Sequence, residues 1–319
     1  MRCYRCMTRR IITILVLLTT LAKGAKAQWD VQFADYTTLK SVYNPAASGT
    51  DGLLNVKAAY SMQMLGYDNA PATMYIGGDL PLYFLTPRHG GGISLMSDQI
   101  GMFNTMNLSV NYSYNMKVGK KGRLAVGVQV GMMRETIDPS DIKLEDQNDP
   151  AFPTSKVDGQ HVDFAAGLYY YHPKYWAGLS SLHLMAPAIV MSEKYEVSVP
   201  RSYYFMGGCN IRLKNTFITL QPSCMVMTDL KSIREDLQCK CAYEYEGKKM
   251  YFGLGYSPKV SATFMVGGCF QGVNLGYSYQ LYTSGVKAIN GSHELVLSYQ
   301  TELDLFKKGR NLHKSVRWL

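Results

Sequence analysis

The sequence lacks any long apolar run after its first residues, and its cysteines are few and odd in number. Beyond position 27 of the 319 residues there is no apolar stretch of about 18 residues, the length that a membrane-spanning helix needs. Seven cysteines fall to five once Cys3 and Cys6 are set aside, and an odd number cannot form a complete disulfide framework. These absences exclude a helical membrane protein and a disulfide-stapled domain.

Motifs of catalysis and metal binding are absent as well. The sequence has no G-x-S-x-G, no Walker or dinucleotide-binding glycine motif and no H-E-x-x-H. His293 and Glu294 are adjacent, so in a strand they would project to opposite faces, and His183 is isolated in the sequence. After residue 27 there is no C-x-x-C pair for zinc. We therefore expect a protein that is not an enzyme and holds no cofactor and no metal.

The first 27 residues have the three parts of a secretory signal peptide. Arginines precede an apolar run that begins at Ile11, and Ala25-Lys26-Ala27 supplies a small-x-small cleavage site before Gln28. No cysteine follows this site, so a lipoprotein is not expected. The leader 1–27 carries six positive charges, and its removal lowers the formal net charge from +9 to +3. The basic composition therefore gives no argument for a nucleic-acid partner.

Every second residue is apolar in the stretch MNLSVNYSYNM, which runs from Met106 to Met116. A period of two is that of a β-strand and excludes a helix. The eleven residues of the stretch exceed the roughly 5–6 of a globular strand and match the roughly 9–11 of a strand that crosses a bilayer. The residues between the apolar ones are asparagine and serine, which suit a polar lumen.

The same reading extends over most of the chain and predicts a barrel. Because strand edges cannot be left open in lipid, an even number of such strands predicts an all-β, transmembrane antiparallel β-barrel of the outer membrane, over residues 52–302. Long and short connections alternate, and we expect the long ones outside and the short ones in the periplasm. The fourteen candidate strands are 52–65, 70–80, 90–100, 103–116, 122–134, 160–172, 174–184, 200–214, 215–228, 237–246, 248–257, 260–270, 272–282 and 291–302.

Segments outside the strands carry their own signals. Residues 28–51 mix aromatic and polar side chains and predict a folded N-terminal segment that lies in the periplasm or plugs the lumen. Residues 303–319 are basic and predict a periplasmic tail, and the loop 135–159 is rich in acids. The aromatic stretch 169–176 indicates an interfacial girdle in the lipid headgroups; stacking of sugars in the lumen is the alternative.

Several stretches together resemble the PorP/SprF family of the Bacteroidetes, membrane proteins of the type IX secretion system. The mature start QWDVQFADYTTLKSVYNPAASG resembles that family's opening, DFAAGLYYYHPKYWAGLSSLHL its central strand pair, and GYSYQLYTSG and GSHELVLSY its last two strands. Gln280 departs from the family, which usually has an acid there. The residues that carry the resemblance most clearly are Gln32, Phe33, Tyr36, Asn44, Pro45, Ala46, Gly49, Gly291, Ser292, His293 and Glu294.

The resemblance implies a non-enzymatic outer-membrane component of the secretion and gliding machinery that supports secretion or surface anchoring of cargo proteins. The implied partners are outer-membrane lipid, periplasmic and inner-membrane secretion proteins, and a secreted cargo or surface protein. The motif residues would then have a structural or partner-binding role.

Two other functions are compatible with the sequence. A channel for small hydrophobic molecules, similar to the fatty-acid transporters, would also have about fourteen strands and an N-terminal hatch. It would need a lumen pocket lined by Phe and Leu, whereas the inner faces here carry Asn, Ser, Gln and Gly. A water-filled porin is the third possibility.

Overall fold

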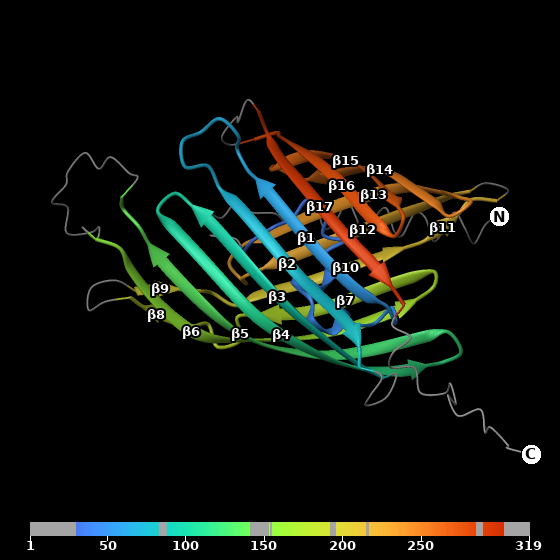
Figure 1. Cartoon of the computed structure of the whole chain (residues 1–319), viewed down its shortest axis with the longest axis horizontal. Coiled ribbons are helices and arrows are strands. Elements are labelled where there is room, and N and C mark those ends of the chain that lie inside the picture. Colours follow the sequence, from blue (N-terminus) through green and yellow to red (C-terminus); the bar gives the residue numbers. More distant parts are fainter. Residues whose placement is uncertain are drawn as a thin grey trace, which may run out of the picture.

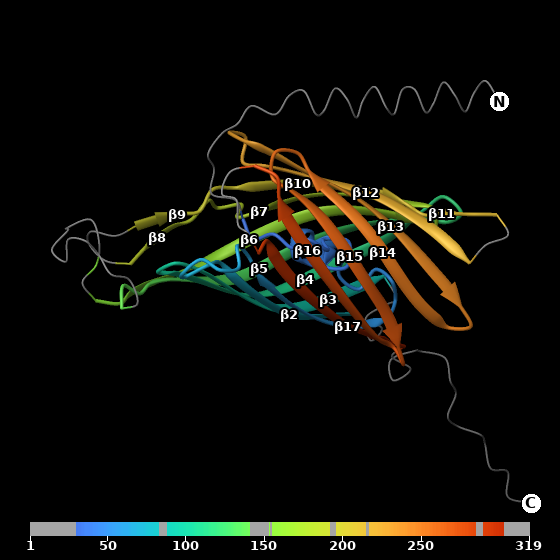
Figure 2. The ribbon, with the colours of Figure 1, turned by 90° about the horizontal axis from the view of Figure 1, so that it is seen from above.

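A single antiparallel sheet closes on itself and forms the barrel in Figures 1 and 2. The computed structural model describes residues 30–82, 88–140, 153, 155–191, 196–214, 217–284 and 290–302. The predicted signal peptide, the predicted basic tail and most of the acidic loop lie outside these residues. The all-β class and the closed barrel of 14 strands are confirmed.

Each barrel strand follows one of the predicted segments, with ends that differ by a few residues. Ile211–Arg212 continues the preceding strand after Asn210, and both pair with the strand that follows, so the two count as one. The strands are β1 (Leu54–Met62), β2 (Ala72–Pro81), β3 (His89–Ile100), β4 (Phe103–Val118), β5 (Gly122–Ile137), β6 (Val157–His172), β7 (Tyr175–Leu182), β10 (Ser202–Cys209), β11 (Ile211–Arg212), β12 (Ile218–Thr228), β13 (Ile233–Tyr245), β14 (Lys248–Ser257), β15 (Ser261–Phe270), β16 (Val273–Tyr282) and β17 (Ser292–Thr301).

Pairing runs in chain order around the wall. β1 pairs with β17 and β10 pairs with β12, which leaves no free edge between the first and the last strand. A short hairpin of β8 (Ala188–Val190) and β9 (Glu196–Ser198) forms a separate sheet in the connection from β7 to β10. This hairpin was not predicted, because three residues in each strand are too few for an alternating pattern to be recognised.

The alternation along β4 separates a lipid face from a lumen face. Leu108 and Val110 are 50% and 57% exposed on the outside, whereas Asn111 and Ser113 are 5% and 0% exposed on the inside. An apolar exterior is what the hydrocarbon layer requires. Exposed Val, Leu, Ile, Met and Phe side chains recur on β1 to β7 and on β14 to β17, so the apolar belt runs around the wall.

The two rims differ in the length of their connections. Among the described residues, the short-turn rim comprises 82, 88, 119–121, 173–174, 213–214, 217, 246–247 and 271–272. The long-loop rim comprises 63–71, 101–102, 138–140, 153, 155–156, 183–191, 196–201, 229–232, 258–260, 283–284 and 290–291. The connection between the candidate strands 215–228 and 237–246 is shorter than expected, because β13 already begins at Ile233.

The aromatic stretch near the short-turn rim was predicted as a girdle against lipid, and this is only half right. Tyr170 and Tyr175 stack on the outer face with ring centroids 5.8 Å apart. Tyr169, Tyr171 and Trp176 instead point into the lumen, where they pack together. Successive residues of a strand must face opposite sides, so a continuous aromatic run cannot lie wholly in lipid.

The core of the molecule lies inside the barrel. The N-terminal residues 30–53, here called the lumen segment, are enclosed by the strands, as the blue ribbon in Figure 2 shows. The segment contains the helix α2 (Lys40–Tyr43) and the 3-10 helix η1 (Pro45–Ala47). None of the helices among the described residues is long and apolar enough to span a membrane.

Candidate functional site

Four large side chains of the lumen segment form its apolar core. Phe33, Tyr36, Leu39 and Tyr43 are between 0% and 3% exposed. They pack against residues from several walls of the barrel, among them Tyr75, Ala165, Tyr204 and Met225. Burial of each such side chain contributes about 1.5–3 kcal/mol, so apolar packing fixes the segment in the lumen. Phe33 and Tyr36 were predicted motif residues, and the structure places both in this core.

The side chain of Glu294, on β17, binds the backbone of the first turn of the lumen segment. Its carboxylate accepts hydrogen bonds from the backbone N–H groups of Ala34 (2.6 Å) and Asp35 (2.9 Å). The amide of Gln238, on β13, donates to the carbonyl of Ala34. Glu294 is 4% exposed, and buried backbone donors require such partners. The acidic residue of the last-strand motif is therefore a clamp on the N-terminal motif.

Asp35 carries a second, charged anchor. Its carboxylate lies 2.5 Å from the ammonium of Lys240 on β13 and accepts a hydrogen bond from the Tyr251 hydroxyl at 3.3 Å. Burial opposes ionisation of Asp35, but the Lys240 ammonium outweighs it and holds the pKa of the carboxyl below its usual range. Neither residue was predicted. An ionisable side chain at a lumen-facing position, such as Lys240 among CKCAY, is the signal that could have indicated it.

The Asn44-Pro45-Ala46 motif closes the segment against β5, β6 and β7. The side-chain amide of Asn44 donates to the carbonyls of Leu168 (2.9 Å) and Leu179 (3.3 Å). Its carbonyl accepts the Ala46 N–H at 2.9 Å and thereby caps η1, with Pro45 at the first helical position. One asparagine thus joins the segment to two wall strands and starts the next turn.

Gly49 lies where only glycine fits. Its φ of +65° is unfavourable for other residues, and a Cβ would overlap the carbonyl oxygen of Leu80. This close approach lets the Gly49 N–H donate to the Asp79 carboxylate at 2.9 Å. Asp79 also accepts from Asn55 and pairs with Lys57, so this anchor connects the segment to β1 and β2.

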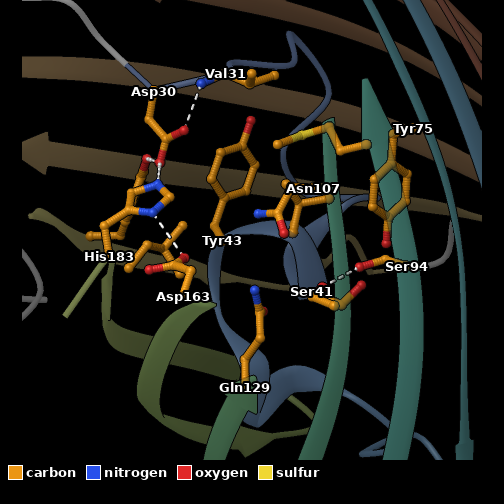
Figure 3. A pocket seen from close by; sticks show the side chains of 15 residues that line it. Asp30, Val31, Ser41, Tyr43, Tyr75, Ser94, Asn107, Gln129, Asp163 and His183 are labelled. Carbon is orange, nitrogen blue, oxygen red and sulfur yellow. Dashed lines mark hydrogen bonds and ion pairs between the residues drawn. The ribbon is translucent and has the colours of Figure 1, made fainter. Parts of the chain in front are cut away.

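At the other end of the segment, Asp30 lies beside the long-loop rim. The His183 ring lies between two carboxylates, with Nε2 at 3.2 Å from Asp30 and Nδ1 at 2.9 Å from Asp163, as Figure 3 shows. Tyr204 donates to the same Asp30 oxygen at 3.0 Å. Burial alone would lower the pKa of His183, but the two carboxylates outweigh it and raise the pKa to about 10. His183, which is isolated in the sequence, is thus the centre of an ion-pair network.

Two cavities adjoin the lumen segment. Towards the long-loop rim, a small chamber of about 30 Å³ is bordered by Asn107, Gln129, Asp163 and His183 (Figure 3). Towards the short-turn rim, a vestibule of about 1350 Å³ opens above α2. Ser41 lies on both, since α2 separates them. Both cavities have polar and charged side chains among their lining residues, together with apolar ones.

The predicted motif residues do not all converge on one site. Gln32 donates to the sulfur of Met227 inside the lumen at 2.8 Å. Gly291 turns the chain before β17 with a φ of +63°. Ser292 contacts the Tyr282 hydroxyl at 2.7 Å at the long-loop rim. His293 lies on the outer face, 2.7 Å from the Tyr277 hydroxyl. The four consecutive residues Gly291 to Glu294 therefore have different surroundings. Among them, Glu294 is the one with hydrogen bonds to the described part of the lumen segment.

The buried ionisable groups of this arrangement bind other parts of the chain. Within the described ranges no group of three His, Cys, Asp or Glu side chains could hold a metal ion. The buried ionisable groups hold the lumen segment in place: Glu294 binds backbone N–H groups, Lys240 binds Asp35, and His183 binds Asp30. These groups thus attach the lumen segment to the inner face of the barrel.

Comparison with known proteins gives a family but only distant structural relatives. The family model of the type IX secretion system membrane protein PorP/SprF matches residues 25–299. No curated protein matches the chain by sequence. A FadL homologue of Pseudomonas aeruginosa has 12% identity and a TM-score of 0.46, over 81% of this chain and 91% of its own. The CymD monoaromatic hydrocarbon channel has 12% identity and a TM-score of 0.47, over 87% and 94%. Values this low carry no argument about function.

Proposed function

The chain belongs to the PorP/SprF family of type IX secretion system membrane proteins, and from this premise we propose that it supports the secretion or surface anchoring of cargo proteins. It is an outer-membrane protein: its family is one of membrane proteins, and it forms a closed barrel. Family and fold are those of a membrane barrel and not those of an enzyme family. Membership of the family implies association with the secretion machinery.

One observation carries the proposal beyond the family. The lumen is occupied by the chain's own N-terminal segment, which is anchored to Asp79, Leu168, Ser180, Lys240 and Glu294 on five strands. A water-filled porin keeps its lumen groups available for the permeant molecule, whereas here many of them bind the chain itself. This supports a barrel that serves as a base for partner proteins. In this proposal the motif residues Gln32, Phe33, Tyr36, Asn44 and Pro45 hold the segment in the form that partners recognise.

The alternative, a channel for small hydrophobic molecules, finds less support. No phenylalanine lines the vestibule, and Leu275 is its one leucine among the described residues. Seven cationic side chains line the same cavity. Binding an apolar molecule there would leave these charges without water.

The proposal is tested by purifying the tagged protein from its native outer membrane in a gentle detergent, followed by mass spectrometry. We expect secretion proteins, or one large surface protein, in stoichiometric amounts. An unrelated outer-membrane barrel with the same tag serves as the control. A barrel that carries lipid and no protein would contradict the proposal and favour the channel.

A further inference from the structure

The side chains that line the vestibule carry an excess of positive charge. Its lining includes seven cationic side chains and only three carboxylates, those of Asp51, Asp79 and Glu244. The cations come from the lumen segment, from strands and from turns of the short-turn rim. They are Lys40, Lys57, Lys174, Arg212, Lys214, Lys240 and Lys249.

Ion pairs within the protein neutralise only part of this charge. Lys57 pairs with Asp79 at 3.4 Å, Lys240 with Asp35 at 2.5 Å and Lys249 with Glu244 at 3.3 Å. Among the described residues, no carboxylate lies within 4.0 Å of the other four cations. These four are Lys40, Lys174, Arg212 and Lys214.

Lys40 shows that the charge is crowded as well as unpaired. Its ammonium lies over the Trp176 ring at 3.9 Å and donates to the Tyr169 hydroxyl at 3.3 Å. Burial, followed by repulsion from Lys57 and Lys240, lowers the pKa of Lys40 to about 7. A bound anion would relieve this repulsion, because an opposite charge nearby favours the protonated amine.

The cations are spread from the floor of the cavity to its rim. Lys40 lies on α2 at the floor, Lys174 in the turn between β6 and β7, and Arg212 and Lys214 at the end of β11. The volume of about 1350 Å³ exceeds the roughly 300–1,000 Å³ of a small-molecule pocket. A long ligand with several negative charges fits this distribution better than a single small anion does.

The aromatic side chains favour a peptide over a charged sugar polymer. A sugar would stack on open ring faces, but Lys40 covers Trp176 and Lys240 lies 4.7 Å from the Tyr251 ring centre. Tyr169 and Tyr171 stack on each other with centroids 5.9 Å apart. Six of the seven cations are lysines, whose ammonium groups are flexible point charges that suit scattered negative groups along a chain.

We propose that the vestibule is a binding site for an acidic polypeptide segment, which enters from the short-turn rim with its Asp and Glu side chains on the unpaired cations. This inference stands on the charge and shape of the vestibule and not on the secretion role. The cargo proposal could fail while this site binds its peptide, and the reverse also holds.

The test uses the purified full-length barrel in a neutral detergent, with Trp29→Phe and Trp318→Phe so that Trp176 is the one fluorescent tryptophan. Titration with a short polyglutamate peptide should change the Trp176 fluorescence to saturation. The combined variant Lys174→Gln, Arg212→Gln, Lys214→Gln should weaken binding about tenfold or more, since it removes three exposed charges of the site.

A matched control variant removes three charges from the same rim outside the vestibule. Lys117→Gln, Lys120→Gln, Lys121→Gln should bind the peptide as the parent does, and all variants should keep the heat-sensitive gel mobility of a folded barrel. Equal weakening by both triple variants would overturn the proposal, since it would indicate unspecific attraction. No saturable signal, or saturation by polygalacturonate or inorganic phosphate but not by polyglutamate, would also overturn it.

Discussion

Glu294 shows how a single side chain can join segments that lie far apart in the sequence. It lies on the last strand, and the N–H groups that it binds belong to Ala34 and Asp35 near the start. Its neighbour His293 faces the outside of the barrel and contacts Tyr277. Substitution of Glu294 should therefore lower the free energy of unfolding more than substitution of His293.

We predict that Glu294→Ala lowers the free energy of unfolding by about 2 kcal/mol, because two buried backbone donors lose a charged acceptor. Urea unfolding in detergent micelles, followed by tryptophan fluorescence, measures the change. His293→Ala is the matched control on the same strand and should cost less than about 1 kcal/mol. Equal effects of the two substitutions would show that Glu294 does not clamp the segment.

His183 gives a pH-dependent contribution whose sign follows from its environment. Its pKa is raised from 6.5 to about 10 by the carboxylates of Asp30 and Asp163, against the effect of burial. A raised pKa adds stability that is complete below pH 6.5 and is lost as the pH rises through about 10. Wild type should therefore be more stable than His183→Gln at pH 6.5, and the difference should shrink towards pH 10. A difference that stays constant over this range would mean that His183 is not charged.

At the scale of elements, the lumen segment fills the barrel without taking part in its sheet. Among the described residues, the barrel strands pair in the sheet only with one another around the closed wall. The segment contributes side-chain packing, with Phe33, Tyr36, Leu39 and Tyr43 as its core, and a set of polar anchors. Backbone pairing between strands thus stabilises the barrel wall, whereas side-chain packing and polar contacts hold the lumen segment in place.

Deletion of residues 28–45 should accordingly leave a folded barrel but open its lumen and abolish the capture of partner proteins. The chamber and the vestibule would merge, because α2 separates them. Planar-bilayer recordings should show a larger conductance than wild type, and affinity purification should lose the partners. Unchanged gel mobility on heating is the control for folding. Partners that still co-purify with the truncated barrel would refute the role of the segment.

At the scale of the whole molecule, the apolar belt of the barrel must match the membrane. Val110 lies near the middle of β4 and is 57% exposed, whereas Val118 is the last residue of the same strand and is 45% exposed. Their depth in the bilayer differs while their chemistry is the same.

Val110→Lys should therefore destabilise the barrel by about 2–4 kcal/mol, and Val118→Lys by about 0–1 kcal/mol. The measurement is reversible unfolding into urea from lipid vesicles. Similar costs at both positions would show that the belt is not centred on Val110.

Much of this molecule was predictable because strand alternation is a local property. Residues two apart share a face whatever the rest of the chain does, so MNLSVNYSYNM by itself predicted Leu108 and Val110 in lipid and Asn111 and Ser113 in the lumen. The same rule contradicts the girdle reading of the aromatic stretch at Tyr169, Tyr171 and Trp176, which point inward.

The sequence by itself determined the barrel, its strand number and its lipid face. The alternation of apolar residues defines each strand and its outer face, and the number of such segments along the chain gives the number of strands. Only the tertiary structure decided which residues meet in the lumen. His183 and Asp30 are 153 positions apart, and Lys240 and Asp35 are 205 apart. Such pairs produce no periodic pattern in the sequence, because they form only when the barrel closes around the lumen segment. That closure of the barrel places the crowded cations of the vestibule on one side of α2 and the small chamber on the other.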